Sequence, residues 1–275
     1  MEAKRKNKLT KEEMTGRIEA LAQKRRTKEV IQLPICFDDK RATPNSFIRS
    51  ALFSAVLSKD RVFLNNVDLA SQDGITVNYK GEQLNQDDLT LLLALIHLTK
   101  EQPLGSVVTL SAHSILKAMG LNTGGDEHKR LHEGIRRLNG CSVQISHVGK
   151  KYGGPLIKEF YQDENTGHYA VVLNPNLIKL FGDTQWTALD WQQRLVLRRK
   201  PLAQALHAYF SSHMKPFPVS LEFLQKITGS RNTQPAGFKR LCRAALDNLV
   251  AIGFLQEYSF KGDLLTVTRS LTAVA

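Results

Sequence analysis

One order of local patterns occurs twice along the chain, and this repeat restricts the possible fold more than any other feature of the sequence. Met119-Gly120 and Thr228-Gly229 each end a short predicted helix, and the two pairs lie 109 residues apart. The tripeptide Lys-Arg-Leu at 129–131 recurs at 239–241, inside the helix that follows each glycine. Because helix, turn and helix keep nearly the same spacing in both places, we infer an internal duplication of one structural unit.

The first copy of the unit lies in the middle of the chain. Ser111 is a typical N-cap, and Gly120 is typical of the end of a helix. Leu131, Ile135 and Leu138 have the spacing of one helix face. The pattern predicts a strand at 107–110, helices at 111–119 and 126–139, strands at 142–147 and 156–161 around a basic glycine-rich tip at 149–154, a strand at 169–173 and a short helix at 174–181.

The second copy repeats this order near the C-terminus. Pro235 fits the first turn of a long helix, and a hairpin turn is expected at 261–263. The predicted apolar stripe of the long helix comprises Phe238, Leu241, Ala245, Leu249 and Ile252. The predicted elements are helices at 202–212, 221–228 and 235–252 and strands at 254–260 and 264–268.

Upstream of both copies the pattern predicts a helix at 46–57, strands at 61–69 and 75–79 and a helix at 85–100. Helix, turn, helix and hairpin is the order of a winged helix. We therefore expect an α+β fold of two tandem winged-helix domains behind a basic, flexible N-terminal arm. The expected boundaries are 1–43 for the arm and an extended segment, 44–185 for the first domain and 186–270 for the second. The length of 275 residues agrees with about two domains.

The net charge indicates a polyanionic partner. Lys and Arg number 38 against 26 Asp and Glu, which gives +12. The excess gathers at 1–29, 126–158 and 226–243, and the last window has five cations and no acid. Nucleic acid is the most frequent partner of such patches, and an anionic membrane is the alternative.

Other features favour a cytoplasmic protein. The longest apolar run, 89–98, is half of the roughly 20 residues that a bilayer span needs, and the charged N-terminus lacks the pattern of a secretory signal. The cysteines Cys36, Cys141 and Cys242 are widely separated and odd in number, so we expect reduced thiols rather than disulfides or a zinc site.

The long helix of the second copy is the first candidate for DNA recognition. A helix-turn-helix places its second helix in the major groove, which is about 12 Å wide. Away from the apolar stripe, the helix and its N-terminal approach carry the predicted DNA-binding residues Arg231, Asn232, Thr233, Gln234, Lys239, Arg240 and Arg243. A solvated amphipathic helix without a partner is the alternative.

The first copy offers a comparable but more diluted set. The predicted DNA-binding residues are Lys129, Arg130, Arg136 and Arg137 on the helix and Lys150 and Lys151 at the wing tip. Because Glu127 and Glu133 share the helix, we expect this copy to position the protein on phosphates more than to specify bases.

The sequence contains no recognisable set of catalytic residues. There is no P-loop and no His-x-His motif, and the helical pair His128 and His132 lacks the glutamate of a zinc-protease helix. We therefore expect no enzyme activity, no metal and no cofactor.

Several motifs resemble one family. Arg49-Ser50-Ala51-Leu52-Phe53 after Pro44-Asn45, then Tyr209-Phe210-Ser211-Ser212-His213, Pro216-Phe217-Pro218-Val219 and Gly229-Ser230, resemble segments of the TrfA-type replication initiators of broad-host-range plasmids. The resemblance implies two winged-helix domains that bind repeated sites, called iterons, in the double-stranded DNA of a plasmid origin. It also implies opening of an AT-rich element, with single-stranded DNA as a possible ligand. Loading of the host helicase with the host initiator would follow, and inactive dimers would limit copy number.

The same resemblance implies a motif for the host sliding clamp just before the first domain. Gln32, Leu33, Ile35 and Phe37 fit it, because an extended peptide would insert Ile35 and Phe37 into apolar pockets while Gln32 bonds at the rim. The alternative is that this segment packs on its own domain.

Two other functions stay open at this stage. A duplicated winged-helix repressor would bind DNA without opening it. A DNA-nicking relaxase is disfavoured by the missing His-x-His motif.

Overall fold

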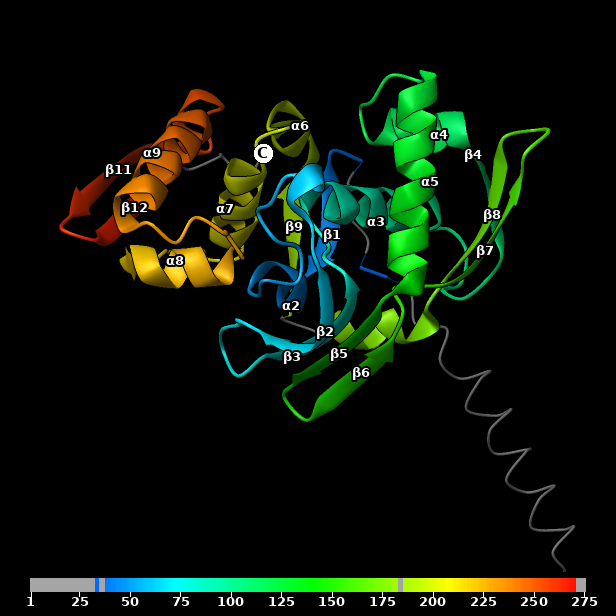
Figure 1. Ribbon diagram of the computed structural model, residues 1–275, viewed down its shortest axis with the longest axis horizontal. Helices are drawn as coiled ribbons and strands as arrows, with labels where there is room; N and C mark the ends of the chain where they lie inside the picture. Colours follow the sequence, from blue (N-terminus) through cyan, green and yellow to red (C-terminus); the bar gives the residue numbers. More distant parts are fainter. Residues whose placement is uncertain (1–32, 35–37, 183–184, 271–275) are drawn as a thin grey trace, which may run out of the picture.

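The computed structural model describes residues 33–34, 38–182 and 185–270, and it has a mixed α/β fold (Figure 1). A two-stranded sheet joins β1 (Lys40–Pro44) to β9 (Trp186–Asp190), which are far apart in sequence. Within the described residues, no helix is both long and apolar enough to cross a membrane.

The predicted helix at 46–57 is wrong beyond its first turn. The structure has only α2 (Asn45–Ile48) there, followed by an irregular buried segment. Its backbone groups bond to distant partners instead of to one another: Ala51 N donates to Ala70 O at 2.8 Å, and Ser54 N donates to Leu84 O at 2.9 Å. Tertiary hydrogen bonds have therefore overridden the local apolar spacing.

A four-stranded sheet follows, in the order β2-β3-β5-β6. Its strands are β2 (Phe63–Leu69), β3 (Thr76–Glu82), β5 (Ser142–His147) and β6 (Lys150–Gly154). The turn η1 (Ser58–Asp60) precedes β2. The predicted apolar helix is confirmed as α3 (Gln86–Leu98), which Asn85 begins with a capping box that includes Asp88. Because nearly all of α3 is buried, this helix forms the centre of the larger core.

Two units with the same order of elements flank this centre. Unit I consists of β4 (Val108–Ser111), α4 (Ala112–Ala118), α5 (Gly125–Gly140), β7 (Ile157–Asp163) and β8 (His168–Leu173). Unit II consists of β10 (Val219–Ser220), α8 (Leu221–Ile227), α9 (Pro235–Ala251), β11 (Leu255–Lys261) and β12 (Leu264–Arg269). Their sheets have matching orders, β4-β8-β7 and β10-β12-β11.

Local chemistry supports the same equivalence. The hydroxyls of Ser111 and Ser220 cap α4 and α8 in the same way, each accepting from the backbone N–H three residues later. Gly120 and Gly229 end these helices with φ of 64° and 61°, a conformation that favours glycine. The predicted caps and turns are thus confirmed in both units.

The predicted wing of the first copy is wrong. Strand β5 pairs with β3 and β6, not with the strand at 156–161, so Lys150 and Lys151 lie in β6 of the four-stranded sheet. The hairpin equivalent to β11–β12 is β7–β8. The sequence misled because any two nearby strands around a glycine-rich tip look like a hairpin, whereas β3, which is distant in sequence, competes for β5.

The repeated tripeptide is also out of register by one residue. Leu131 is 2 % exposed, whereas Leu241, expected in the apolar stripe, is 43 % exposed. The buried positions of α5 are 127, 131, 134, 135 and 138, and those of α9 are 238, 242, 245, 246 and 249, a constant shift of 111 residues. Cys242, not Leu241, therefore takes the place of Leu131.

The described residues form two hydrophobic clusters. The larger one extends from Ala42 to Trp191 and also includes Ala208, and the smaller one extends from Leu197 to Val267. Strand β9, expected to open the second domain, instead contributes Leu189 to the larger cluster. Three further helical elements complete the fold: η2 (Pro175–Leu180), α6 (Trp191–Val196) and α7 (Pro201–Ser211).

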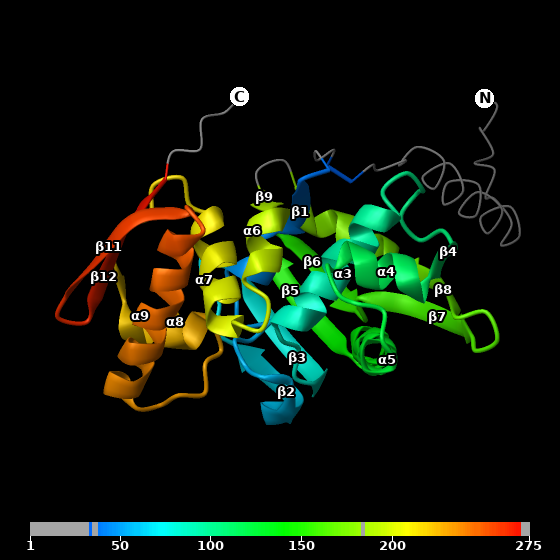
Figure 2. The ribbon, with the colours of Figure 1, turned by 90° about the horizontal axis from the view of Figure 1, so that it is seen from above.

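The two parts lie side by side in Figure 2, and polar side chains meet where they join. Arg49 pairs with Asp73 at 2.6 Å and donates to Ser212 Oγ at 3.0 Å, while Tyr209 Oη donates to Gln72 Oε1 at 2.8 Å. Three of these residues belong to the segments that resemble the initiator family. Those segments therefore include the contacts that hold the two parts together.

A second set of junction residues is fully buried. The Arg194 guanidinium donates to Thr90 Oγ1 at 3.1 Å and to Gln86 O at 2.9 Å, and burial lowers its pKa to about 10. Gln204 Nε2 of α7 donates to Arg194 O at 3.3 Å, and His207 Nε2 of α7 lies 3.1 Å from Gln193 Oε1 of α6. Both Arg194 and His207 are 0 % exposed, and burial lowers the pKa of His207 to about 3.

Candidate nucleic-acid interface

The helices α5 and α9 lie on the same side of the molecule. Figure 1 shows both toward the viewer, and in the perpendicular view of Figure 2 α5 lies near the lower edge while the start of α9 reaches that edge. Each buries one face in its own cluster and leaves a polar face outward. A duplex laid along this side could therefore meet both helices at once.

On α9 the outward face carries two exposed cations. Arg240 and Arg243 are exposed, and within the described part of the chain Arg240 has no hydrogen bond or ion pair. Arg231, Thr233 and Gln234 are also exposed at the start of the helix. These are the arginine and amide groups that read guanine and adenine edges in the major groove.

Lys239 and Arg243 face the adjoining hairpin. Lys239 Nζ donates to Gly262 O at 2.6 Å and lies 3.4 Å from Asp263 Oδ1. Both Lys239 Nζ and the Arg243 guanidinium lie 5.5 Å from the centre of the Phe260 ring. The two cations thus link α9 to the hairpin β11–β12.

Asn232 has a different environment from its neighbours. Its Oδ1 accepts from Gln234 N at 3.1 Å, and Gln225 Nε2 donates to its carbonyl oxygen. A Cβ on Gly237 would lie 3.0 Å from the Asn232 side chain. The half-buried Asn232 therefore stabilises the turn before α9 through its side-chain oxygen and its backbone carbonyl.

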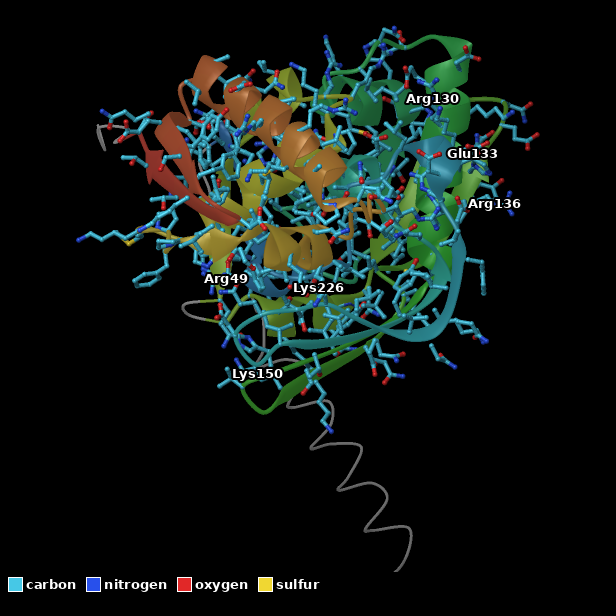
Figure 3. All side chains as sticks on the ribbon, turned by 60° about the vertical axis from the view of Figure 1, so that its left-hand side comes forward. Arg49, Arg130, Glu133, Arg136, Lys150 and Lys226 are labelled. Carbon is cyan, nitrogen blue, oxygen red and sulfur yellow. The ribbon has the colours of Figure 1, made fainter. Side chains whose placement is uncertain are left out.

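On α5 the exposed face is mixed in charge. Arg130, Glu133 and Arg136 lie along its outer side in Figure 3, and Lys129 is exposed beside them. Glu127, expected to dilute this face, is buried and pairs with Arg130 at 3.1 Å. Glu133 remains on the surface between cations, where its carboxylate could accept from the amino group of cytosine.

Arg137 is not part of this exposed face. Its side chain is 11 % exposed and donates to Asp88 Oδ1 through Nε at 3.1 Å and through Nη2 at 2.9 Å. Asp88 is 1 % exposed and is also paired with Arg61. Arg137 therefore joins α5 to the start of α3, and its guanidinium is paired with this buried carboxylate.

Lys150 and Lys151 are exposed, but they lie apart from these helices. Figure 3 shows Lys150 at the lower end of the molecule, away from Arg130 and Arg136. The structure thus does not bring the two lysines together with the cations of α5.

One basic run was missed by the sequence reasoning. Arg198, Arg199 and Lys200 connect α6 to α7, and within the described residues none of them pairs with a carboxylate. Arg198 and Arg199 line a cavity of about 670 Å³ beside α5, and Lys200 lines one of about 590 Å³ beside α9. The sequence does contain a signal for this surface, because three cations are adjacent there and lie outside any apolar stripe.

The segment expected to bind the sliding clamp is mostly undescribed. Gln32, Ile35 and Phe37 lie outside the described residues, whereas Leu33 is partly buried against the larger cluster. This packing agrees with the alternative that part of the segment contacts its own domain.

We next consider whether thiols and acids of the described residues lie close enough together to bind a metal ion. Cys141 and Cys242 are buried and free, and burial raises their pKa values to about 11 and about 12. Within the described residues, no group of three or more His, Cys, Asp or Glu side chains could hold a metal ion.

Two solved structures of RctB domains are similar in fold to this chain. Domains 2 and 3 of RctB match 83 % of this chain and 99 % of their own, with a TM-score of 0.55 and 14 % identity. A second structure of RctB domains 2–3 matches 80 % of this chain and 94 % of its own, with a TM-score of 0.51 and 15 % identity. The chain is thus similar in fold to these RctB structures.

The family follows from sequence. A model of the TrfA protein family matches residues 18–269, and the chain belongs to this family. The plasmid replication initiator protein TrfA of Escherichia coli is 25 % identical over 240 residues, which cover 84 % of this chain. The match spans 62 % of that relative's length.

Proposed function

We propose that this protein is a plasmid replication initiator that binds iteron repeats through two tandem winged-helix domains. The observation that carries the proposal is the repeat of one topology, with an exposed cationic helix in each unit on the same side of the molecule. Membership of the TrfA family and the name of the Escherichia coli relative supply the biological role.

We place the proposed domain boundary close to residue 196. The division into two hydrophobic clusters supports this choice over the expected boundary after 185, because β9 pairs with β1. The first domain would then begin at β1, and the second would comprise α7 and unit II.

In this proposal α5 and α9 enter successive major grooves. Arg240 and Arg243 contact base edges together with Arg231, Thr233 and Gln234, while Lys129, Arg130 and Arg136 serve unit I. Lys239 holds the hairpin of unit II against α9 and adds charge for phosphates. Arg137, Asn232, Lys150 and Lys151 are left out, since the first two have structural partners and β6 lies apart.

The remaining steps rest on the family alone. The protein would act in the bacterial cytoplasm as a monomer, open an AT-rich element and recruit the host initiator, helicase and sliding clamp. It would do so without an active site of its own, by holding and distorting DNA.

Footprinting on a candidate origin fragment tests the proposal. We expect evenly spaced protected sites about two helical turns apart, and permanganate reactivity in a neighbouring AT-rich segment. Protection without permanganate reactivity would favour the repressor. A free 3′ end with covalently attached protein would favour the relaxase.

A further inference from the structure

Between α5 and α9 the surface bears an exposed apolar segment, residues 57–63, which we call the ridge. Leu57 is 46 % exposed, Val62 37 % and Phe63 68 %. Lys59 and Asp60 are exposed between them. Large apolar side chains grouped in this way on a surface commonly mark a binding site.

The ridge is fixed from behind. Arg61, at 7 % side-chain exposure, pairs with Asp88 at 3.1 Å and donates to Asn85 Oδ1 at 2.8 Å. Asn85 Nδ2 donates to Val56 O at 3.2 Å, and Gln83 N donates to Val62 O at 2.8 Å. The start of α3 therefore holds the ridge backbone in place, so its apolar side chains are presented without an ordering cost on binding.

The ridge lies between α5 and α9, on the side of the molecule that we propose faces DNA. Ser58 and Arg61 line the cavity beside α5, and Leu57 and Asp60 line the cavity beside α9. Figures 1 and 2 both show the start of β2 between the two helices, and in Figure 2 it extends as far toward the lower edge as they do. The ridge is thus a third projection on the proposed DNA side.

The geometry of B-DNA then defines the contact. On one side of a duplex, two successive major grooves are separated by a minor groove, which is only about 6 Å wide. With α5 and α9 in the major grooves, a projection midway between them meets this minor groove. Apolar side chains such as Leu and Phe that enter it unstack base steps and kink the duplex.

We propose that residues 57–63 are a minor-groove wedge, in which Leu57 and Phe63 press between base pairs while Lys59 contacts phosphate. Arg198, Arg199 and Lys200 line the same two cavities and supply further phosphate contacts. Asp60 is the one acid of the ridge itself, whereas the exposed acids Asp87 and Glu133 line the cavity beside α5. The inference rests on the proposed function and identifies the part of the protein that would distort the DNA. A second protein copy pairing with the open edge of β2 is the competing occupant.

The test uses the full chain and a duplex that the wild-type protein selects from a random pool. The variants are Phe63→Ser alone and Leu57→Ser with Phe63→Ser. Phe217→Ser is the matched control, because Phe217 is 80 % exposed and lines neither cavity. Thermal unfolding verifies that each variant is folded, as expected for substitutions of exposed side chains.

Bending is measured by energy transfer between labelled duplex ends, and unstacking by 2-aminopurine at the central step. We expect the ridge variants to lose bend and unstacking but keep the two outer protected segments, with Phe217→Ser unchanged. Unaltered bend and unstacking would overturn the proposal. So would a change confined to the sedimentation coefficient, which would assign the ridge to a second copy. If the wild-type protein selects no duplex, the proposed function itself fails.

Discussion

At the scale of single residues, similar cations have different roles because their surroundings differ. Arg240 is exposed and unpaired within the described part of the chain, whereas Arg137 is committed to the buried carboxylate of Asp88. Lys239 is intermediate, with a link to the hairpin turn and a partly exposed side chain. In the sequence all three residues are simply positive charges. Only their contacts in the folded protein distinguish a cation that is available to DNA from one held in a structural ion pair.

Arg240→Ala should weaken binding to the selected duplex by about 1–3 kcal/mol and relax specificity at one base pair, because an arginine at a guanine edge makes two hydrogen bonds. Titration against single-base variants of the duplex measures this. Lys179→Ala, on η2 outside both cavities, is the control. Equal binding by an Arg240→Ala, Arg243→Ala variant would show that the wrong helix has been placed in the groove.

Arg137→Met should instead destabilise the fold. Its loss leaves Asp88 with Arg61 as its remaining cation, so we expect a fall of about 2–3 kcal/mol in the free energy of unfolding. Urea denaturation measures it. The salt dependence of DNA binding by the folded variant should equal that of the wild-type protein, and a reduced slope would mean that Arg137 contacts phosphate after all.

At the scale of elements, local signals predicted most boundaries but not all pairings. Serine caps, glycine ends and the hairpin at 261–263 follow from neighbouring residues, and they were predicted correctly. The partner of β5 and the fate of 46–57 depend on β3 and on backbone groups far along the chain. The repeated tripeptide led to a wrong prediction for the apolar stripe of α9, because identical residues in the two units are not buried to the same extent.

The two helix-ending glycines allow a paired prediction. Gly120→Ala should cost roughly 1–2 kcal/mol, since a left-handed conformation is strained for alanine. Gly229→Ala should cost about 1–3 kcal/mol more, because its Cβ would lie 2.8 Å from Ser54 Cβ, whereas that of Gly120 meets the tip of Leu195. Calorimetry of both variants gives the difference, and equal costs would show that the contact between Gly229 and Ser54 can relax.

At the scale of the whole molecule, the junction decides how the two helices are presented together. Arg49 and Tyr209 link segments that are far apart in sequence, while Gln204 and His207 of α7 contact Arg194 and Gln193 of α6. The larger hydrophobic cluster also includes Ala208 of α7, so apolar packing crosses the junction as well. Together these contacts fix the angle between the parts and so set the spacing of the proposed DNA contacts.

Acid should weaken this junction through His207. Its pKa is lowered by burial to about 3, from an ordinary value near 6.5, so the unfolded chain takes up the proton first as pH falls. His207 should therefore reduce stability between about pH 6.5 and pH 3, by about 1.4 kcal/mol per pH unit. Urea denaturation of wild-type protein and His207→Gln across this range tests it.

The variant should show a shallower loss of stability with falling pH. At pH 8 the imidazole is neutral in both the folded and the unfolded chain, so any difference there reports packing alone. Parallel profiles below pH 6.5 would show that His207 is protonated in the folded protein.

The sequence by itself determined the repeated helices, their caps, the basic helix faces and the family, because each depends on neighbouring residues or on motif identity. The tertiary structure alone decided which hairpin belongs to unit I, where the core of α9 lies, which arginines are buried ion pairs and how the ridge projects between α5 and α9. The physical reason is that strand pairing, burial and ion pairing are competitions among groups far apart in the chain, which only the folded molecule resolves.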